Sequence, residues 1–146
     1  MKLISIQQAD FDPGIEQAKV QSLNPGAIST FTGQVRGDDG IIALTLEHYP
    51  AMTEASLNAL AGEAMARWPL KAVTLIHRVG RMAVGERIVF VLTASDHRAA
   101  SFEACAFLID RLKTDAPFWK QEEWADGDKR WVEARQSDDV AAGRWG

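Results

Sequence analysis

Residues 88–120 read IVFVLTASDHRAASFEACAFLIDRLKTDAPFWK and contain three kinds of segment in succession. Residues 88–93 are apolar and rich in β-branched side chains, which is typical of a buried strand. Asp96 is a suitable N-cap for a helix that starts one or two residues later and runs to about Ala116. A proline ends that helix, and residues 118–123 predict a further short strand. This succession indicates a fold in which helices pack on a sheet.

The rest of the chain shows a similar mixture of segments. Strands are predicted where β-branched and aromatic residues gather, at residues 3–6, 27–35, 41–48, 73–77 and 130–133. Helices are predicted where a capping residue precedes a helical pattern, at residues 13–22, 53–68 and from 137 onward. We therefore expect one domain over residues 1–146 with an α+β fold: an α/β sandwich in which helices pack on a mixed or antiparallel sheet, with a small additional β-subdomain. An α/β fold is the alternative.

Two connections complete the predicted fold. Residues 27–35 and 41–48 flank a short polar loop, which predicts a β-hairpin. Residues 78–86 contain two glycines among polar residues, so they predict an irregular connection rather than a strand.

The composition excludes several classes of function. The net charge of −4 over 146 residues argues against a nucleic-acid-binding protein. The single cysteine, Cys105, excludes an internal disulfide and a cysteine-rich metal site, and we expect neither a metal nor a cofactor. No apolar run approaches the ~18–20 residues that span a bilayer, and residues 1–6 are too short and too soon polar for a signal peptide. We therefore expect a cytoplasmic protein that binds no membrane.

Lys113 is the most unusual residue of the long predicted helix. At 3.6 residues per turn it lies within roughly 20–40° of Phe102, Ala106 and Ile109, on the apolar face. An ammonium group is rare there unless it is paired or functional, and burial near other cations would lower its pKa and suit it to nucleophilic or acid–base chemistry. Lys120, beyond the proline, is a second candidate. The alternative is that Lys113 extends from the last helical turn into solvent and that Lys120 lies on a strand surface.

Two further groups of basic residues indicate an anion site. Arg36 ends a strand between two glycines, where it could pair with phosphate or carboxylate; an ordinary solvated arginine is the alternative. His97 and Arg98 open the long helix, where free amide groups and the helix dipole favour an anion. Alternatively, these two residues face water next to a capping aspartate.

Other polar residues have simpler interpretations. Cys105 shares the apolar face of the helix, and we interpret it as a core residue rather than a catalytic thiol. His48 and His77 end strands and are far from any metal-ligand spacing. Glu122 and the glutamate after it could orient Lys120, but a solvated charge pair is the simpler interpretation.

Six short motifs are distinctive as a set: TFTGQVR (30–36), LTLEHYP (44–50), IHRVG (76–80), HR (97–98), LKTDAPFWK (112–120) and RWVEAR (130–135). In this order, and over nearly the whole chain, they resemble the large, catalytic subunit of molybdopterin synthase. Each motif alone is weakly specific, whereas the set is highly specific.

The resemblance implies a sulfurtransferase of molybdenum-cofactor biosynthesis. Enzymes of this family convert cyclic pyranopterin monophosphate (precursor Z) into molybdopterin by inserting the dithiolene sulfurs. The sulfur arrives as a thiocarboxylate on the C-terminal glycine of a small ubiquitin-like subunit, and the resemblance implies a homodimer within a heterotetramer. A chain with one buried cysteine could therefore carry out sulfur chemistry, because its partner supplies the sulfur.

The resemblance also implies roles for particular residues. Lys113 is expected beside the thiocarboxylate tail, and Lys120 is expected to be the second catalytic lysine. The family's substrate-binding positions correspond to Gln34, Val35, Arg36, His97, Arg98, Lys113, Lys120, Gln121 and Glu122, with Phe31 and Arg135 as additional candidates. Gln34 and Gln121 depart from the lysine and arginine that are common at these positions, and the loop at residues 37–40 is short.

The length of the helix constrains this site. His97 and Lys113 are 16 residues apart, which corresponds to about 24 Å at a rise of 1.5 Å per residue. One pterin phosphate does not readily touch both ends, so we expect a composite site in which the second copy of a twofold dimer supplies His97 and Arg98. In this hypothesis Arg36, His97 and Arg98 anchor the phosphate. Lys113 assists the thiocarboxylate or the acyl intermediate, and Lys120 acts as general acid or base.

Two other functions compete with this interpretation. A non-catalytic dimeric scaffold that docks a ubiquitin-like partner would use exposed apolar surface equally well, but it would not require Lys113. A phosphate-ester enzyme is disfavoured because no carboxylate cluster suited to Mg²⁺ accompanies the arginines.

Overall fold

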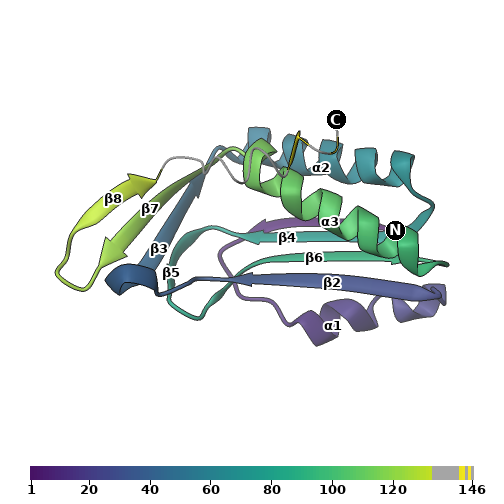
Figure 1. The fold of residues 1–146 in the computed structure, drawn as a ribbon, viewed down its shortest axis with the longest axis horizontal. Helices are drawn as coiled ribbons and strands as arrows, with labels where there is room; N and C mark the ends of the chain where they lie inside the picture. Colours follow the sequence, from purple (N-terminus) through teal and green to yellow (C-terminus); the bar gives the residue numbers. More distant parts are fainter. Residues whose placement is uncertain (133–141, 144, 146) are drawn as a thin grey trace.

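The computed structural model describes residues 1–132, 142, 143 and 145, which form two sheets with helices (Figure 1). Sheet A has the strand order β1 (Lys2–Gln7), β4 (Leu70–Arg78), β6 (Arg87–Ser95) and β2 (Ala27–Gln34). Sheet B has the order β5 (Gly80–Ala83), β3 (Ile41–His48), β7 (Phe118–Trp124) and β8 (Lys129–Val132). The helices are α1 (Pro13–Ala18), α2 (Pro50–Arg67) and α3 (Arg98–Asp115), with 3₁₀ turns at Gln21–Leu23 and Asp38–Gly40. The predicted α+β fold with an additional β-subdomain is confirmed.

Helices cover sheet A on both faces (Figure 1). Side chains alternate along a strand, so Val73 and Leu75 of β4 join the core beneath α2 and α3, which includes Phe107 of α3. Ile76, the next residue of β4, faces the other way and packs in a second core with Phe11, which lies just before α1. The alternation therefore builds a three-layer arrangement around one mixed sheet.

The strand register determines which residues lie at each end of sheet A. β2 pairs antiparallel with β6, from Ala27 opposite Ser95 to Gln34 opposite Arg87. β4 also pairs antiparallel with β6, and its His77 lies opposite Val89. His77 and Gln34 therefore lie toward one end of sheet A, whereas Ser95 lies at the other end, where the chain enters α3.

Sheet B extends beyond the end of sheet A that carries Gln34 (Figure 1). Its central strands β3 and β7 are antiparallel, with Leu46 opposite Lys120 and Glu47 opposite Trp119. Leu46 is buried in a small cluster with Val35 and Met82, so this face of sheet B is joined to the end of β2. Glu47 and Trp119 lie on the opposite face and are exposed.

Two predicted connections are wrong. The expected hairpin of residues 27–35 and 41–48 does not form, because β2 pairs with β6 in sheet A while β3 pairs with β5 and β7 in sheet B. The expected irregular connection contains strand β5, which begins at Gly80 with a φ of 89° and lies antiparallel to β3. A glycine accommodates this left-handed backbone without strain, so a residue that suggested a break instead starts a strand.

The helix boundaries also need correction. The helix expected at residues 13–22 ends at Ala18 and gives way to a 3₁₀ turn. Asp96 does not cap α3: the N-cap is His97, without a side-chain hydrogen bond, and the Asp96 carboxylate forms an ion pair with Lys71 at 2.9 Å. The helix expected from residue 137 lies outside the described residues.

Candidate active site

Lys113 lies in the last turn of α3 and is exposed. The buried face of α3 carries smaller residues together with large apolar ones: Ala100, Ser101, Ala104, Cys105, Phe107, Leu108 and Leu112. Phe102, which shares the helical face of Lys113, is 64% exposed. The prediction that Lys113 is buried on an apolar face is therefore wrong. The helical period correctly grouped the neighbours of Lys113, but a different face of α3 packs on the sheet.

Cys105 lies on that buried face, as expected of a core residue. Burial raises the pKa of its thiol to about 11, so the thiol stays protonated at neutral pH. This residue is therefore poorly suited to serve as a nucleophile.

Lys120 lies in the middle of sheet B and is partly buried. Its neighbours across the strands are Leu46 on β3 and Val132 on β8. Phe118, two residues earlier on β7, lies on the same face as Lys120 because side chains alternate along a strand. Lys120 is therefore held among apolar neighbours on the face of sheet B that joins sheet A.

His77 is a buried residue on which the charges of both lysines act. Its imidazole is 9% exposed and stacks on the Phe118 ring with 4.0 Å between ring centroids. Burial, together with the positive charges of Lys120, Lys113 and His48, lowers the pKa of His77 from 6.5 to about 4, although the hydrogen bond with the Arg78 main chain acts in the opposite direction. Lys113 and Lys120 of one chain therefore both act on the same buried ring.

The two histidines are site residues that sequence reasoning missed. His48 lies opposite Phe118 in the β3–β7 pair, with 6.3 Å between ring centroids. His77 lies near the end of β4, in a run of buried residues. That position was the signal that could have identified it, because a buried imidazole needs a hydrogen-bond partner. Metal-ligand spacing was the wrong criterion for both.

The end of β2 carries three of the predicted substrate-binding residues. Arg36 is exposed and forms an ion pair with Asp38 at 3.2 Å, and Gln34 is exposed. The side chain of Val35 is buried in the cluster with Leu46, so it packs in the protein interior. Because Leu46 is also the neighbour of Lys120, this end of β2 adjoins the strand that carries the second lysine.

Three further candidates lie around these residues. Phe31 of β2 packs against the core beneath α2 and α3. Glu122 lies on the same face of β7 as Lys120, whereas Gln121 lies on the opposite face. Arg135 lies outside the described residues.

His97 and Arg98 lie at the end of sheet A that is farther from Lys120. Both are exposed at the start of α3, next to the end of β6 that pairs with Ala27. Seven steps along β2 separate Ala27 from Gln34, or about 24 Å at ~3.4 Å per residue. A single chain therefore does not bring His97 and Arg98 together with the lysines.

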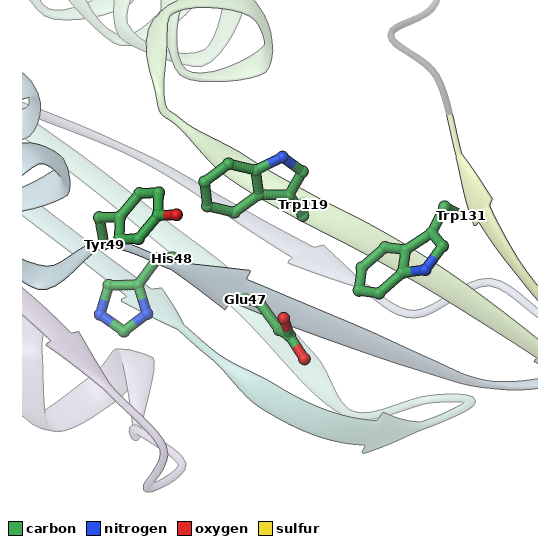
Figure 2. A pocket seen from close by; sticks show the side chains of 5 residues that line it. All are labelled: Glu47, His48, Tyr49, Trp119 and Trp131. Carbon is green, nitrogen blue, oxygen red and sulfur yellow. The ribbon is translucent and has the colours of Figure 1, made fainter.

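A pocket opens on sheet B, and its lining includes Glu47 and Trp119 of the exposed face. Figure 2 shows its lining residues, which are Glu47, His48, Tyr49, Trp119 and Trp131. The Tyr49 and Trp119 rings meet edge to face at a centroid distance of 4.9 Å. Tyr49, Trp119 and Trp131 are all exposed, and exposed aromatic residues grouped in this way are typical of binding surfaces.

The described part of the chain offers no cluster of three or more histidine, cysteine, aspartate or glutamate side chains that could hold a metal ion. Nor does any helix among the described residues have the length and apolar character needed to cross a membrane.

The structure defines a class of protein: an α+β protein of two sheets, with an exposed lysine at the end of α3 and a partly buried lysine on β7. The chain belongs to the MoaE protein family, whose model matches residues 6–115. The expected resemblance is thereby confirmed. Lys113 falls inside the matched range, and Lys120 follows it.

Comparisons with individual proteins extend the match beyond residue 115. The molybdopterin synthase catalytic subunit of Pseudomonas aeruginosa is 52% identical over 147 residues, which covers 97% of each chain. The protein of the same name from Escherichia coli is 56% identical over 123 residues, covering 82% of this chain and 81% of that one. The solved structure of a molybdopterin biosynthesis MoaE protein from Burkholderia ambifaria has a TM-score of 0.85 and 48% identity, and covers 100% of this chain and 99% of that chain.

Proposed function

We propose that this chain is the catalytic subunit that converts cyclic pyranopterin monophosphate into molybdopterin, with sulfur supplied by the C-terminal thiocarboxylate of a small ubiquitin-like subunit. The observation that carries the proposal is that Lys113 and Lys120 both act as positive charges on the buried ring of His77. Relatives about half identical to this chain bear the name molybdopterin synthase catalytic subunit, which supports it.

The charge of the site suits these substrates. A thiocarboxylate and a phosphate monoester are both anions, and the two lysines that act on His77, Lys120 and Lys113, carry positive charge. Positive charges that are only partly screened by water attract such anions and stabilise negative charge that develops during the reaction.

The different surroundings of the two lysines suggest different roles. Lys113 is exposed, as a group must be if the tail of another protein is to reach it. We assign it to the thiocarboxylate and to the acyl intermediate. Lys120 is partly buried beside Leu46 and Val132, where an ammonium group is less hydrated and better suited to proton transfer with the pterin.

The proposal includes a homodimer within a heterotetramer. His97 and Arg98 lie about 24 Å from Lys113 along α3, so a phosphate-binding role for them requires a second copy of the chain. We also propose a cytoplasmic location, which suits a protein whose single cysteine is buried and unpaired.

The test is single-turnover conversion of cyclic pyranopterin monophosphate with thiocarboxylated small subunit. We expect Lys113→Ala and Lys120→Ala each to lower the rate by about 100-fold or more while small-subunit binding is retained, since each removes a positioned charge from the reacting groups. Lys2→Ala is the matched control, because Lys2 is exposed on β1 at the far end of sheet A, and it should keep the wild-type rate.

The aromatic pocket favours one competing function, a scaffold that docks a ubiquitin-like partner without catalysis. Wild-type protein that binds the small subunit but converts no precursor would support the scaffold and contradict the sulfurtransferase. Wild-type rates in both lysine variants would instead remove the lysines from the chemistry.

A further inference from the structure

His77 is a buried polar residue that follows Leu75 and Ile76 on β4. It lies near the end of β4, between Ile6 of β1 and Val89 of β6, and is 9% exposed. A buried imidazole costs free energy unless its nitrogens are hydrogen-bonded. The partners of the two nitrogens therefore indicate what the ring does.

The first nitrogen defines the tautomer. Nδ1 of His77 lies 2.9 Å from the main-chain oxygen of Arg78. A carbonyl oxygen only accepts hydrogen bonds, so Nδ1 carries the proton and donates it. In the neutral ring Nε2 is then left with a lone pair and acts as an acceptor.

The orientation of this ring is fixed from two sides. The side chain of Arg78 anchors its residue by donating to the carbonyl oxygen of Gln8 at 3.0 Å and to that of Arg87 at 2.9 Å. Phe118 stacks on the face of the imidazole at an interplanar angle of 24°. The direction of the Nε2 lone pair is therefore determined by the fold rather than by a free side-chain rotation.

Of the two lysines that act on His77, Lys120 is the candidate donor for this acceptor. It shares a face of β7 with Phe118, whose ring touches His77, and among the cations that act on His77 it has the largest effect. Its aliphatic stem is flanked by Leu46 and Val132 on the neighbouring strands. The stem of the lysine thus has apolar neighbours on both adjacent strands.

We propose that His77 is a positioning residue for Lys120: its neutral imidazole, oriented by the Arg78 carbonyl and the Phe118 ring, presents Nε2 as the hydrogen-bond acceptor that orients the Lys120 ammonium group. The effect on catalysis rests on the proposed function. The effect on Lys120 itself does not, because it can be measured without substrate.

Two substitutions separate the acceptor from the shape of the ring. His77→Phe keeps a flat ring against Phe118 but removes the acceptor, whereas His77→Gln keeps a side-chain oxygen that can accept. Leu75→Val is the control, since Leu75 is buried on the same face of β4 and its shortening disturbs packing alone.

The activity experiment compares these proteins in complex with thiocarboxylated small subunit. We expect His77→Phe to lower the single-turnover rate about tenfold with substrate and small-subunit affinities within about twofold, because a mispositioned group slows chemistry more than binding. His77→Gln should recover to within about threefold of wild type, and Leu75→Val should match wild type. Equal losses in the Phe and Gln variants, or none in the Phe variant, would overturn the proposal.

The second experiment needs no activity. The protein is labelled with a trace of acetic anhydride at fixed pH, and mass spectrometry reads the acetylation of Lys120 relative to that of the exposed Lys2. We expect the ratio to rise about threefold or more in His77→Phe, because an ammonium without its acceptor gives up its proton more readily, and to stay near wild type in His77→Gln. An unchanged ratio in His77→Phe overturns the positioning role. If the wild-type protein is inactive but the acetylation ratios are as expected, the proposed function is refuted and the positioning role of His77 stands.

Discussion

At the scale of single residues, the buried imidazole of His77 links the site to the stability of the fold. Burial, with help from Lys120, Lys113 and His48, lowers its pKa from 6.5 to about 4. Between these two values the unfolded chain binds a proton that the folded chain does not. The contribution to stability is therefore complete above pH 6.5 and is lost as the pH falls toward 4.

The size of this loss can be measured. A difference of about 2.5 pKa units corresponds to at most about 3–4 kcal/mol of unfolding free energy. Urea unfolding at pH 7 and pH 4.5 should therefore show a smaller pH-dependent loss in His77→Gln than in wild type, by up to about 2–3 kcal/mol, because pH 4.5 lies above the pKa of the folded state. Groups such as Asp10 and Glu86, whose pKa values are lowered by ion pairs and hydrogen bonds, titrate in both proteins and cancel in the comparison.

The control for this experiment is Leu75→Val, because it shortens a buried side chain of the same strand without removing a titratable group and should leave the pH dependence as in wild type. If His77→Gln and wild type lose stability equally between the two pH values, His77 is not a buried neutral histidine, and the tautomer argument would have to be given up with it.

The residues of the site were only partly predictable from the sequence. Lys113 and Lys120 could be identified because they belong to a distinctive motif, and both lie where they act on His77. The burial of Lys113 could not be predicted, because the helical period shows which residues share a face but not which face packs on the sheet. His77 was missed because its partners, Arg78 and Phe118, are supplied by main-chain geometry and by a strand about 40 residues away.

At the scale of helices and strands, the sequence indicated most elements but not how the strands pair. β2 and β3 each have the β-branched pattern of a strand, and both form. Their assignment to different sheets depends on long-range partners, β6 for β2 and β7 for β3, which local preference does not encode. The hairpin prediction was wrong for this reason.

Glycines within these elements offer a test of the backbone. Gly62 lies in the middle of α2, is exposed, and has open space where a Cβ would stand. Gly62→Ala should therefore stabilise the protein by about 0.5–1 kcal/mol, because alanine loses less conformational freedom than glycine when a helix forms. Thermal and urea unfolding of the purified chain would measure the gain.

Gly26 is the matched control for this substitution. It lies in the turn before β2, and a Cβ there would collide with the main-chain carbonyl oxygen of Asp96. Gly26→Ala should destabilise the protein by about 1–3 kcal/mol, since two backbone segments must move apart. A gain of stability at Gly26, or a loss at Gly62, would show that the turn or the helix is packed differently.

At the scale of the whole molecule, the predicted basic residues form two groups at opposite ends of sheet A. Lys113, Lys120 and Arg36 lie toward the end where sheet B begins, whereas His97 and Arg98 lie where α3 starts. Two independent measures, the length of α3 and the register of β2 on β6, both give a separation of about 24 Å. A twofold dimer is the simplest assembly that could bring the lysines of one copy next to His97 and Arg98 of the other copy.

A complementation experiment distinguishes this composite site from a site within one chain. Lys113→Ala and the double variant His97→Ala/Arg98→Ala are each expected to be inactive as homodimers. In a mixed dimer, one of the two composite sites would combine the intact Lys113 of one copy with the intact His97 and Arg98 of the other.

Unfolding and refolding the two variants together in equal amounts should make about half of the dimers mixed, so that about one quarter of wild-type activity returns. Each variant refolded alone provides the baseline. If the mixture stays at that baseline although mixed dimers are detected by mass spectrometry, His97 and Arg98 do not act across the dimer. Their loss of activity would then have to come from a role within their own chain.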